Sequence, residues 1–432
     1  MLADPEVVPS ISAAMAEARA AAKAPMDGVR DWYDGVTFRE AIAAGLFDTD
    51  SCMALGISMD GFEVGRQRGC EGWPIVATVI SVNLGERVNN VAQIIPVVTP
   101  GPRQPVDVES FLHPIAEELD EMAKGIDGIK VAGRDSTSTL HAYALQFTTD
   151  MPGGDKLLNA KGHNGQCPGR FREFFGVRVK KRHYYPTVDP FPPKRMRFSI
   201  QRFATRLRTA HSIAKDAEEG EAARREGKSI AAVDALAIKS GIKGYSLFLS
   251  PSPEDRLRYP NRGYFSKIGP AALPYDTMHL VLSNVTQRLW ALFSGEFGVI
   301  GTTPEPYILP RTTVTAIGRE IEAGRATEPS TQARSIRDIN VHYRSYKASD
   351  WMFFLLSVGE VVLGNRLPEE VLVAFMYLCK AARQMFRPSG LSKVELTTVE
   401  SHIKKICRAS TSKSTLGVLS ASMYAAMCLS PC

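Results

Sequence analysis

The fold of this chain is decided by the stretch Leu55-Gly56-Ile57-Ser58-Met59-Asp60-Gly61-Phe62. An apolar run ends here in an acid, and a glycine follows the acid directly. A strand that ends this way holds a carboxylate at the rim of a sheet, and the glycine lets the backbone turn away without steric cost. Such a carboxylate can hold Mg²⁺, which prefers oxygen ligands. Taken alone, the Asp60-Gly61 pair is more simply an ordinary turn, because these residue types dominate turns for local reasons.

The residues around this stretch predict three strands, then a helix, then a fourth strand. The strands are expected at 54–60, 73–82 and 91–98, where β-branched and apolar residues are concentrated. Short turns join them, which favours an antiparallel meander. Apolar residues at helical spacing predict a helix over 111–122. A further apolar run at 139–147 predicts the fourth strand.

The fourth strand also leads to an acid, Asp150. The order strand, strand, strand, helix, strand is that of the ribonuclease-H-like fold, in which the first and fourth strands are parallel neighbours. Adjacent strands lie about 4.8 Å apart, so Asp60 and Asp150 could share two metal ions about 3.5–4 Å apart. We therefore expect an α/β (α+β) fold with a ribonuclease-H-like mixed sheet, a helical insertion and a helical C-terminal domain.

Composition places the chain among globular proteins. Its 432 residues suffice for two or three domains, and 44% hydrophobic with 23% charged residues argues against global disorder. Seven scattered cysteines indicate reduced thiols in an intracellular protein rather than a disulfide framework. We find no secretory signal and no run of about eighteen apolar residues, so we expect no membrane partner. The net charge of +6 does not by itself imply nucleic acid.

Five regions are expected along the chain. They are an N-terminal arm with short helices (1–50), the first part of the core (51–190), a basic and charged helical insertion (191–270), a core-closing helix (271–298) and a helical C-terminal domain (299–432).

Positive charge is concentrated in residues 170–208, which contain nine arginines and three lysines against two acids. Aromatic residues are interleaved with them. Arginine forks fit phosphates and aromatic rings stack on unpaired bases, so this pattern favours contact with nucleic acid. The alternative is a solvated, proline-containing linker. The expected DNA-binding residues are Arg170, Arg172, Arg178, Lys180, Lys181, Arg182, Lys194, Arg195 and Arg197.

Seven short motifs lie in order between about Asp31 and Phe386. They are Ile57-Ser58-Met59-Asp60-Gly61-Phe62, Trp73-Pro74-Ile75, Pro100-Gly101-Pro102-Arg103-Gln104-Pro105 with Asp107 and Ser110-Phe111-Leu112, Thr149-Asp150-Met151-Pro152, Lys161-Gly162-His163-Asn164-Gly165, Gly241-Ile242-Lys243-Gly244, and Pro274-Tyr275-Asp276-Thr277-Met278-His279-Leu280. In these motifs, their order and their spacing, the chain resembles the CACTA-type (En/Spm-like) DNA transposases of fungal genomes. The resemblance implies a nuclear, Mg²⁺-dependent enzyme that cuts transposon ends and joins them to target DNA, with homo-oligomer formation left open.

The resemblance also implies a catalytic constellation. In such enzymes three acids hold two metal ions; Asp60 would be the first acid and Asp150 the second. The third is expected on the helix after the Met-His pair, but Ser283 stands in that place and residues 280–284 contain no acid. Asp276 and His279 are then candidates for a supporting role beside the metal ligands. His279 is more simply a core or supporting residue than a metal ligand, since magnesium prefers oxygen.

A second departure from the family concerns zinc. The family usually carries a Cys-x-x-Cys pair after His163, whereas here Cys167 is followed by Pro168-Gly169-Arg170. A structural zinc site needs about four protein ligands, and His163, Cys167 and His183 supply at most three. We therefore expect no zinc site, with His163 and Cys167 as its weak candidates.

These departures, and the last 20 or so residues that match no part of the family, suggest a degenerate or truncated copy with impaired activity. The alternative is a catalytically dead DNA-binding or protein-interaction module derived from a transposase. A third reading is an unrelated α+β enzyme that uses Asp276 and His279 as an acid–base pair.

Overall fold

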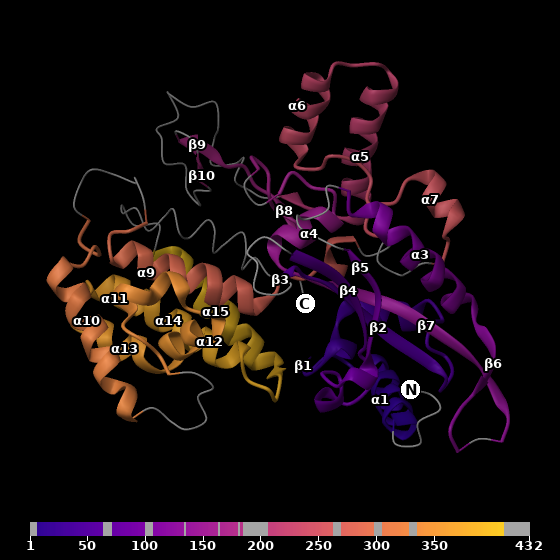
Figure 1. Cartoon of the computed structure of the whole chain (residues 1–432), viewed down its shortest axis with the longest axis horizontal. Helices are drawn as coiled ribbons and strands as arrows, with labels where there is room; N and C mark the ends of the chain where they lie inside the picture. Colours follow the sequence, from indigo (N-terminus) through magenta and orange to yellow (C-terminus); the bar gives the residue numbers. More distant parts are fainter. Residues whose placement is uncertain are drawn as a thin grey trace. The chain divides into compact units, whose positions relative to one another are not determined.

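A computed structural model of the chain describes residues 7–63, 71–99, 107–133, 135–162, 165–179, 182–184, 206–261, 269–297, 305–327 and 335–409. The chain divides into two compact units (Figure 1). The first contains the described residues up to Phe175 and those from 206 to Tyr275. The second contains the described residues from Asp276 onward, together with the hairpin of β9 (Val177–Val179) and β10 (Arg182–Tyr184).

The first unit is built on a mixed sheet. Its strands are β2 (Cys52–Met59), β3 (Phe62–Glu63), β4 (Glu71–Val79), β5 (Gln93–Thr99), β6 (Ile126–Lys130) and β7 (Thr137–Thr148). Hydrogen bonding orders them β5–β4–β2–β7–β6, with β3 beside the start of β4. The pair β2–β7 is parallel, and the other pairs are antiparallel. The chain is therefore a mixed α/β protein.

The expected meander and the expected parallel pairing of the first and fourth strands are both present. Strand β6 is not among the elements that the sequence predicts, since no strand is expected between the helix at 111–122 and the strand at 139–147. It forms an antiparallel pair with β7 that includes Ile126 opposite Leu140. Most of its residues are exposed, so it lacks the apolar run by which a buried strand is recognised.

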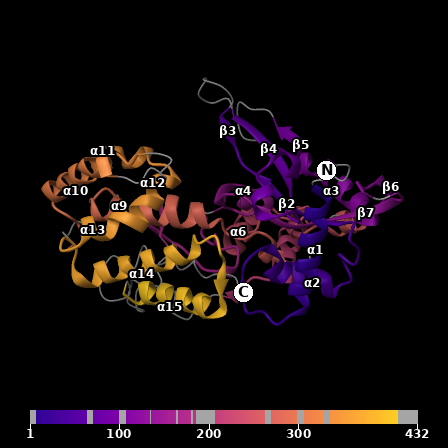
Figure 2. The same ribbon diagram turned by 90° about the horizontal axis from the view of Figure 1, so that it is seen from below.

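Strand β2 occupies the middle of the sheet because almost all of it is apolar. Its side chains from Cys52 to Ile57 are buried, and so is Met59. Helix α3 (Glu109–Lys124) contacts β7 and β5, whereas α1 (Val7–Lys23) contacts β2 and α2 (Val36–Ala43) contacts β7. Figure 2 shows α1 and α2 below the strands of the sheet. One hydrophobic core joins these elements.

After β7 the first unit becomes largely helical. Its elements are α4 (Met151–Leu157), the short strand pair β8 (Arg172–Glu173) and β11 (Arg206–Leu207), and the helices α5 (Ala210–Arg225), α6 (Ile230–Ser240) and α7 (Pro253–Arg258). Reciprocal hydrogen bonds between Thr209 and Ser212 begin α5, and Ser229 caps α6. Residues 191–205 of the predicted insertion lie outside the described residues.

The described helices of the second unit enclose an aromatic core. They are η6 (Met278–Thr286, π-helical), α9 (Gln287–Phe293), α10 (Arg311–Gly324), α11 (Ile339–His342), α12 (Ala348–Phe353), η9 (Phe354–Val358, π-helical), α13 (Gly359–Leu363), α14 (Glu369–Met385) and α15 (Lys393–Ala409). Trp290 meets Phe354 edge-to-face, with ring centroids 5.8 Å apart. The segment predicted as the core-closing helix therefore packs within this unit, and its closing of the sheet stays a prediction. None of the described helices has both the length and the apolarity that a bilayer crossing requires.

One side-chain hydrogen bond ties the ends of β2 and β7 together, and its removal is testable. The hydroxyl of the buried Thr149 donates to the carbonyl oxygen of Met59 at 2.7 Å. Thr149→Val keeps the shape and removes the donor, so we expect the free energy of unfolding to fall by about 1–2 kcal/mol in a urea titration. The matched control is Thr148→Val at the exposed neighbouring position, which should change it by less than about 0.5 kcal/mol. Equal effects of the two substitutions would contradict this.

Candidate functional site

The two predicted acidic ligands leave the sheet at the same edge. The parallel register places Ser58 of β2 opposite Thr148 of β7, and each acid stands two residues further along its strand. The hydrogen bond from the Thr149 hydroxyl to the Met59 carbonyl joins the two chain segments at the residues directly before the two acids. Asp60 and Asp150, which are 90 positions apart in the sequence, therefore follow the ends of two adjacent parallel strands.

Each carboxylate uses one oxygen to hold its own turn. The Oδ1 atom of the exposed Asp60 accepts the N–H of Gly61 at 2.8 Å. The Oδ1 atom of the half-buried Asp150 accepts the N–H of Gly153 at 2.7 Å and so caps helix α4. Among the described residues no Lys or Arg side chain forms an ion pair with either carboxylate. Both acids therefore keep a second oxygen for another ligand.

An aromatic ring packs against the first acid's turn. A Cβ atom at Gly61 would lie 2.5 Å from Cζ2 of Trp73, so only glycine lets the Asp60 turn approach this indole. The Lys156 ammonium of α4 lies 5.3 Å from the centroid of the same ring. Trp73 thus links β4, the turn after β2 and the helix that follows β7.

These residues fit a Mg²⁺ ion in part. Magnesium in proteins is commonly held by one or two carboxylates, with waters and substrate phosphates completing an octahedron. Asp60 and Asp150 supply such a pair of hard oxygen donors. The described part of the chain contains no group of three or more His, Cys, Asp or Glu side chains that could hold a metal. The predicted third acid is therefore not found among these residues.

Asp276 and His279 are partners of each other in the second unit. Asp276 Oδ2 lies 2.7 Å from His279 Nδ1, and its Oδ1 accepts the N–H of Met278 at the start of η6. Ser283, which stands where the resemblance predicts the third acid, lies within η6. The next acid along the chain, Glu296, accepts the Tyr343 hydroxyl at 2.6 Å and pairs with two arginines, and the Tyr343 hydrogen bond is the main cause of its lowered pKa. Glu296 is thus held by structural contacts.

The predicted DNA-binding residues are described only in part. Lys180, Lys181, Lys194, Arg195 and Arg197 lie outside the described residues, and of Arg178 and Arg182 only the backbone is described. Arg172 is half-buried in β8. Arg170 is 1% exposed and presents no surface to a phosphate. Its side chain donates a hydrogen bond to the main-chain carbonyl of Asp150 instead.

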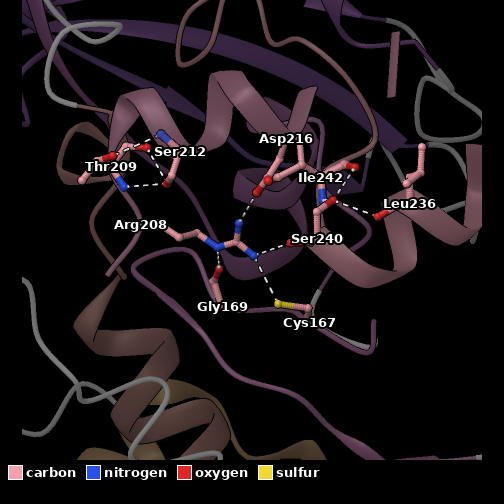
Figure 3. A network of polar contacts seen from close by, with 9 residues as sticks. All are labelled: Cys167, Gly169, Arg208, Thr209, Ser212, Asp216, Leu236, Ser240 and Ile242. Atoms are coloured by element: carbon pink, nitrogen blue, oxygen red, sulfur yellow. Dashed lines mark hydrogen bonds and ion pairs between the residues drawn. The ribbon is translucent and has the colours of Figure 1, made fainter. Parts of the chain in front are cut away.

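The predicted weak zinc ligand Cys167 is in contact with an arginine (Figure 3). The thiol is buried, and Arg208 Nη2 donates to its sulfur at 3.2 Å. The same guanidinium donates to the carbonyl oxygens of Gly169 and Ser240 and pairs with Asp216 at 3.3 Å. Burial raises the pKa of the Cys167 thiol, an effect that the Arg208 charge opposes. A cation from the chain itself therefore occupies one side of this sulfur; His163 lies outside the described residues.

Two supporting residues were not recognised as such from the sequence. In the sequence, Thr149 is only one residue of a motif, and Arg170 is one of the cations of the basic stretch 170–208. The signal that could have found them is local: Thr149-Asp150-Met151-Pro152-Gly153-Gly154 places two glycines in the first turn of a helix. Consecutive glycines there indicate that something approaches closely.

Comparison of the sequence with models of known protein families gives no match, and comparison with curated proteins gives none either.

The Arg208 contacts predict that this part of the chain does not need a metal. Arg208→Lys keeps the charge but cannot reach all four groups. We expect a loss of roughly 2–3 kcal/mol in the free energy of unfolding, since hydrogen bonds to charged groups contribute about 1.5–3 kcal/mol each. In Mg²⁺-free buffer, calorimetry should give the same melting temperature for the wild-type protein with and without excess EDTA. Arg224→Lys, at an exposed arginine of α5, is the control. A fall in melting temperature when EDTA is added in Mg²⁺-free buffer would contradict this prediction.

Proposed function

We propose that this chain is a transposon-derived DNA-binding protein whose first unit is a transposase-type, ribonuclease-H-like core with impaired activity. Asp60 and Asp150 are its metal ligands, DNA at transposon ends is its partner, and the nucleus is its compartment. The strand order and pairing of the sheet support the finer fold assignment. The motifs shared with the CACTA-type transposases support the choice of substrate.

The observation that carries this proposal is the parallel pair β2–β7. It places two carboxylates at one edge of the sheet from chain segments far apart in sequence. An ordinary turn at Asp60-Gly61 would not require a second acid at the end of the neighbouring strand. The shared edge is the arrangement that joint ligation of a metal ion needs.

The chain's own residues would bind and orient the ion and the DNA. Asp60 and Asp150 would each offer an oxygen, while the Gly61 and Gly153 amides fix the two side chains. Bound Mg²⁺ supplies activation of the attacking water or 3′-hydroxyl and stabilisation of the leaving oxygen. Residues 280–284, where the third acid of the family is expected, contain no acid. This supports impaired rather than full activity, because two carboxylates hold two ions less completely than three.

The direct test is cleavage of DNA that carries transposon ends, with Mg²⁺ or Mn²⁺. Asp60→Asn and Asp150→Asn remove charge while keeping a side chain that can accept the same backbone hydrogen bond. Loss of a residue that hydrogen-bonds a metal ligand lowers activity about 10–100-fold. Each of these substitutions changes a ligand itself and should lower the rate of nicking by more than that. A gel assay of nicked product measures this.

Asp48→Asn is the matched control, because Asp48 is exposed and lies before the opposite end of β2. It should nick like the wild type. Wild-type nicking that survives in the Asp60→Asn/Asp150→Asn double variant would exclude these acids. If Asp276→Asn alone abolished a metal-independent activity, the acid–base pair reading would be favoured.

A second candidate function, DNA binding without cleavage, is supported by a group of cations on the second unit. Lys380 of α14 and Lys405 of α15 are exposed, and their ammonium groups lie 5.8 and 4.8 Å from the centroid of the Tyr377 ring. His402 lies beside the same ring, with centroids 5.3 Å apart. Its pKa is lowered first by burial and then by the two lysines. Two ammonium groups held over one ring form a surface that suits phosphates.

The salt dependence of DNA binding tests this surface. If both lysines contact phosphates, the Lys380→Ala/Lys405→Ala double variant should reduce the slope of log K against log salt by about 2, since each phosphate contact adds about 0.9. Fluorescence anisotropy at several salt concentrations measures the slope. Lys404→Ala is the control, because Lys404 is engaged by Glu400 at 2.6 Å. An unchanged slope in the double variant would remove this surface from the DNA interface.

A further inference from the structure

Arg170 is a buried cation held against the first turn of helix α4. Its Nη2 atom donates to the carbonyl oxygens of Met151 at 2.6 Å and Asp150 at 3.2 Å. The guanidinium carbon lies 5.1 Å from the centroid of the Tyr275 ring, and Nε lies 3.8 Å from a carboxylate oxygen of Asp155. The side chain therefore holds the carbonyls of two successive peptides, Asp150–Met151 and Met151–Pro152.

Helix electrostatics alone do not explain a cation at this place. The N-terminal end of a helix carries partial positive charge, so a buried arginine there is unfavourable. Asp155, also buried, lies near enough to compensate part of that charge. Burial raises the pKa of the Tyr275 hydroxyl, and the Arg170 charge is the largest opposing effect. The contacts that the guanidinium makes must offset these costs in the folded protein.

The sequence of α4 makes room for this contact. A Cβ atom at Gly154 would lie 2.1 Å from Nη2 of Arg170. A Cβ atom at Gly153 would lie 2.1 Å from the Thr149 hydroxyl and 3.0 Å from Asp150 Oδ1. Glycine is a poor helix residue, yet two of them stand in this seven-residue helix. One admits the arginine, and the other admits the carboxylate with its strand-end threonine.

The contact fixes Asp150 without neutralising it. Arg170 bonds the backbone carbonyl of Asp150, whereas Asp150 Oδ1 accepts the Gly153 amide. Among the described residues the Asp150 carboxylate forms no ion pair with Arg170 or any other cation. Its negative charge stays available, and its position is set by the braced turn.

The geometry points to Arg170 as a positioning residue that braces the β7–α4 turn and thereby holds the Asp150 carboxylate ready to bind a divalent cation. This inference rests on the proposed function for the identity of the ligand. It does not rest on it for the bracing itself, which is a property of the turn. Two measurements therefore test it, one with the cation and one without.

The first measurement is Mn²⁺ binding, followed by the loss of the free Mn²⁺ signal in electron paramagnetic resonance. Arg170→Gln should raise the dissociation constant for Mn²⁺ at least about 10-fold, the lower limit for loss of a residue that supports a metal ligand. Arg170→Lys should restore part of the affinity, because one ammonium can still reach a carbonyl. Arg208→Lys is the matched control: it changes a second buried arginine that bonds main-chain carbonyls but does not touch Asp150. It should destabilise the protein and leave Mn²⁺ affinity unchanged.

The second measurement is hydrogen exchange of the Gly153 amide without metal. Its N–H bonds Asp150 Oδ1, so loss of the brace should speed its exchange at least about 10-fold in Arg170→Gln and not in Arg208→Lys. Gly154→Ala gives an independent variant that keeps the arginine. Alanine favours helix, so this change would raise the melting temperature if the arginine contact were unimportant; we expect the melting temperature to fall and Gly153 exchange to quicken.

The outcomes separate the two proposals. Wild-type protein that binds no Mn²⁺, or binds it equally in Asp60→Asn/Asp150→Asn, defeats the proposed function, and Gly153 exchange then decides the bracing alone. If Arg170→Lys and Arg208→Lys lower the melting temperature alike, with Gly153 exchange and Mn²⁺ affinity at wild-type values, the positioning role is overturned. Should Arg170→Gln fail to fold, Arg170→Lys and Gly154→Ala carry the same two comparisons.

Discussion

The parallel pairing of β2 with β7 is the constraint from which the rest of the candidate site follows. Parallel strands cannot be joined by a tight turn, so the chain must travel through β4, β5, α3 and β6 before it returns beside β2. The register then brings two strand ends to one edge. The threonine hydroxyl bond across those ends fixes the last residue before each acid turn. A slip of the register would separate the acids, even if every strand survived.

Much of this architecture could be predicted because it depends on local patterns. The apolar runs near Leu55 and Leu145 predict buried strands, and the helical spacing of apolar residues over 111–122 predicts α3. Strand β6 could not be predicted in the same way, since its residues are largely exposed. It forms a strand by antiparallel pairing with β7, the strand that follows it in the chain. The third acid is a different case: a resemblance predicts where it should stand, and no described residue near that place supplies it.

The arginines show the limit of charge patterns. Arg170 and Arg208 belong to a stretch whose composition is typical of a nucleic-acid surface, yet both side chains are buried. Composition counts charges without recording which backbone carbonyls and acids surround them in the folded chain. Arg170 meets Met151 and Arg208 meets Ser240, partners 19 and 32 positions away. Contacts of this kind depend on the conformation of the intervening turns, which the charge pattern does not record.

The bond between Arg208 and the Cys167 thiol affects how well this part of the fold tolerates substitution. A fold cross-linked by a metal loses its link when any one ligand mutates, so its ligand residues must persist together. Here the link is one side chain that reaches two carbonyls, a carboxylate and a sulfur. Two of these four partners are main-chain carbonyls, which are present whatever side chain stands at those positions. Loss of the Cys167 thiol would therefore leave three of the four contacts of Arg208 in place.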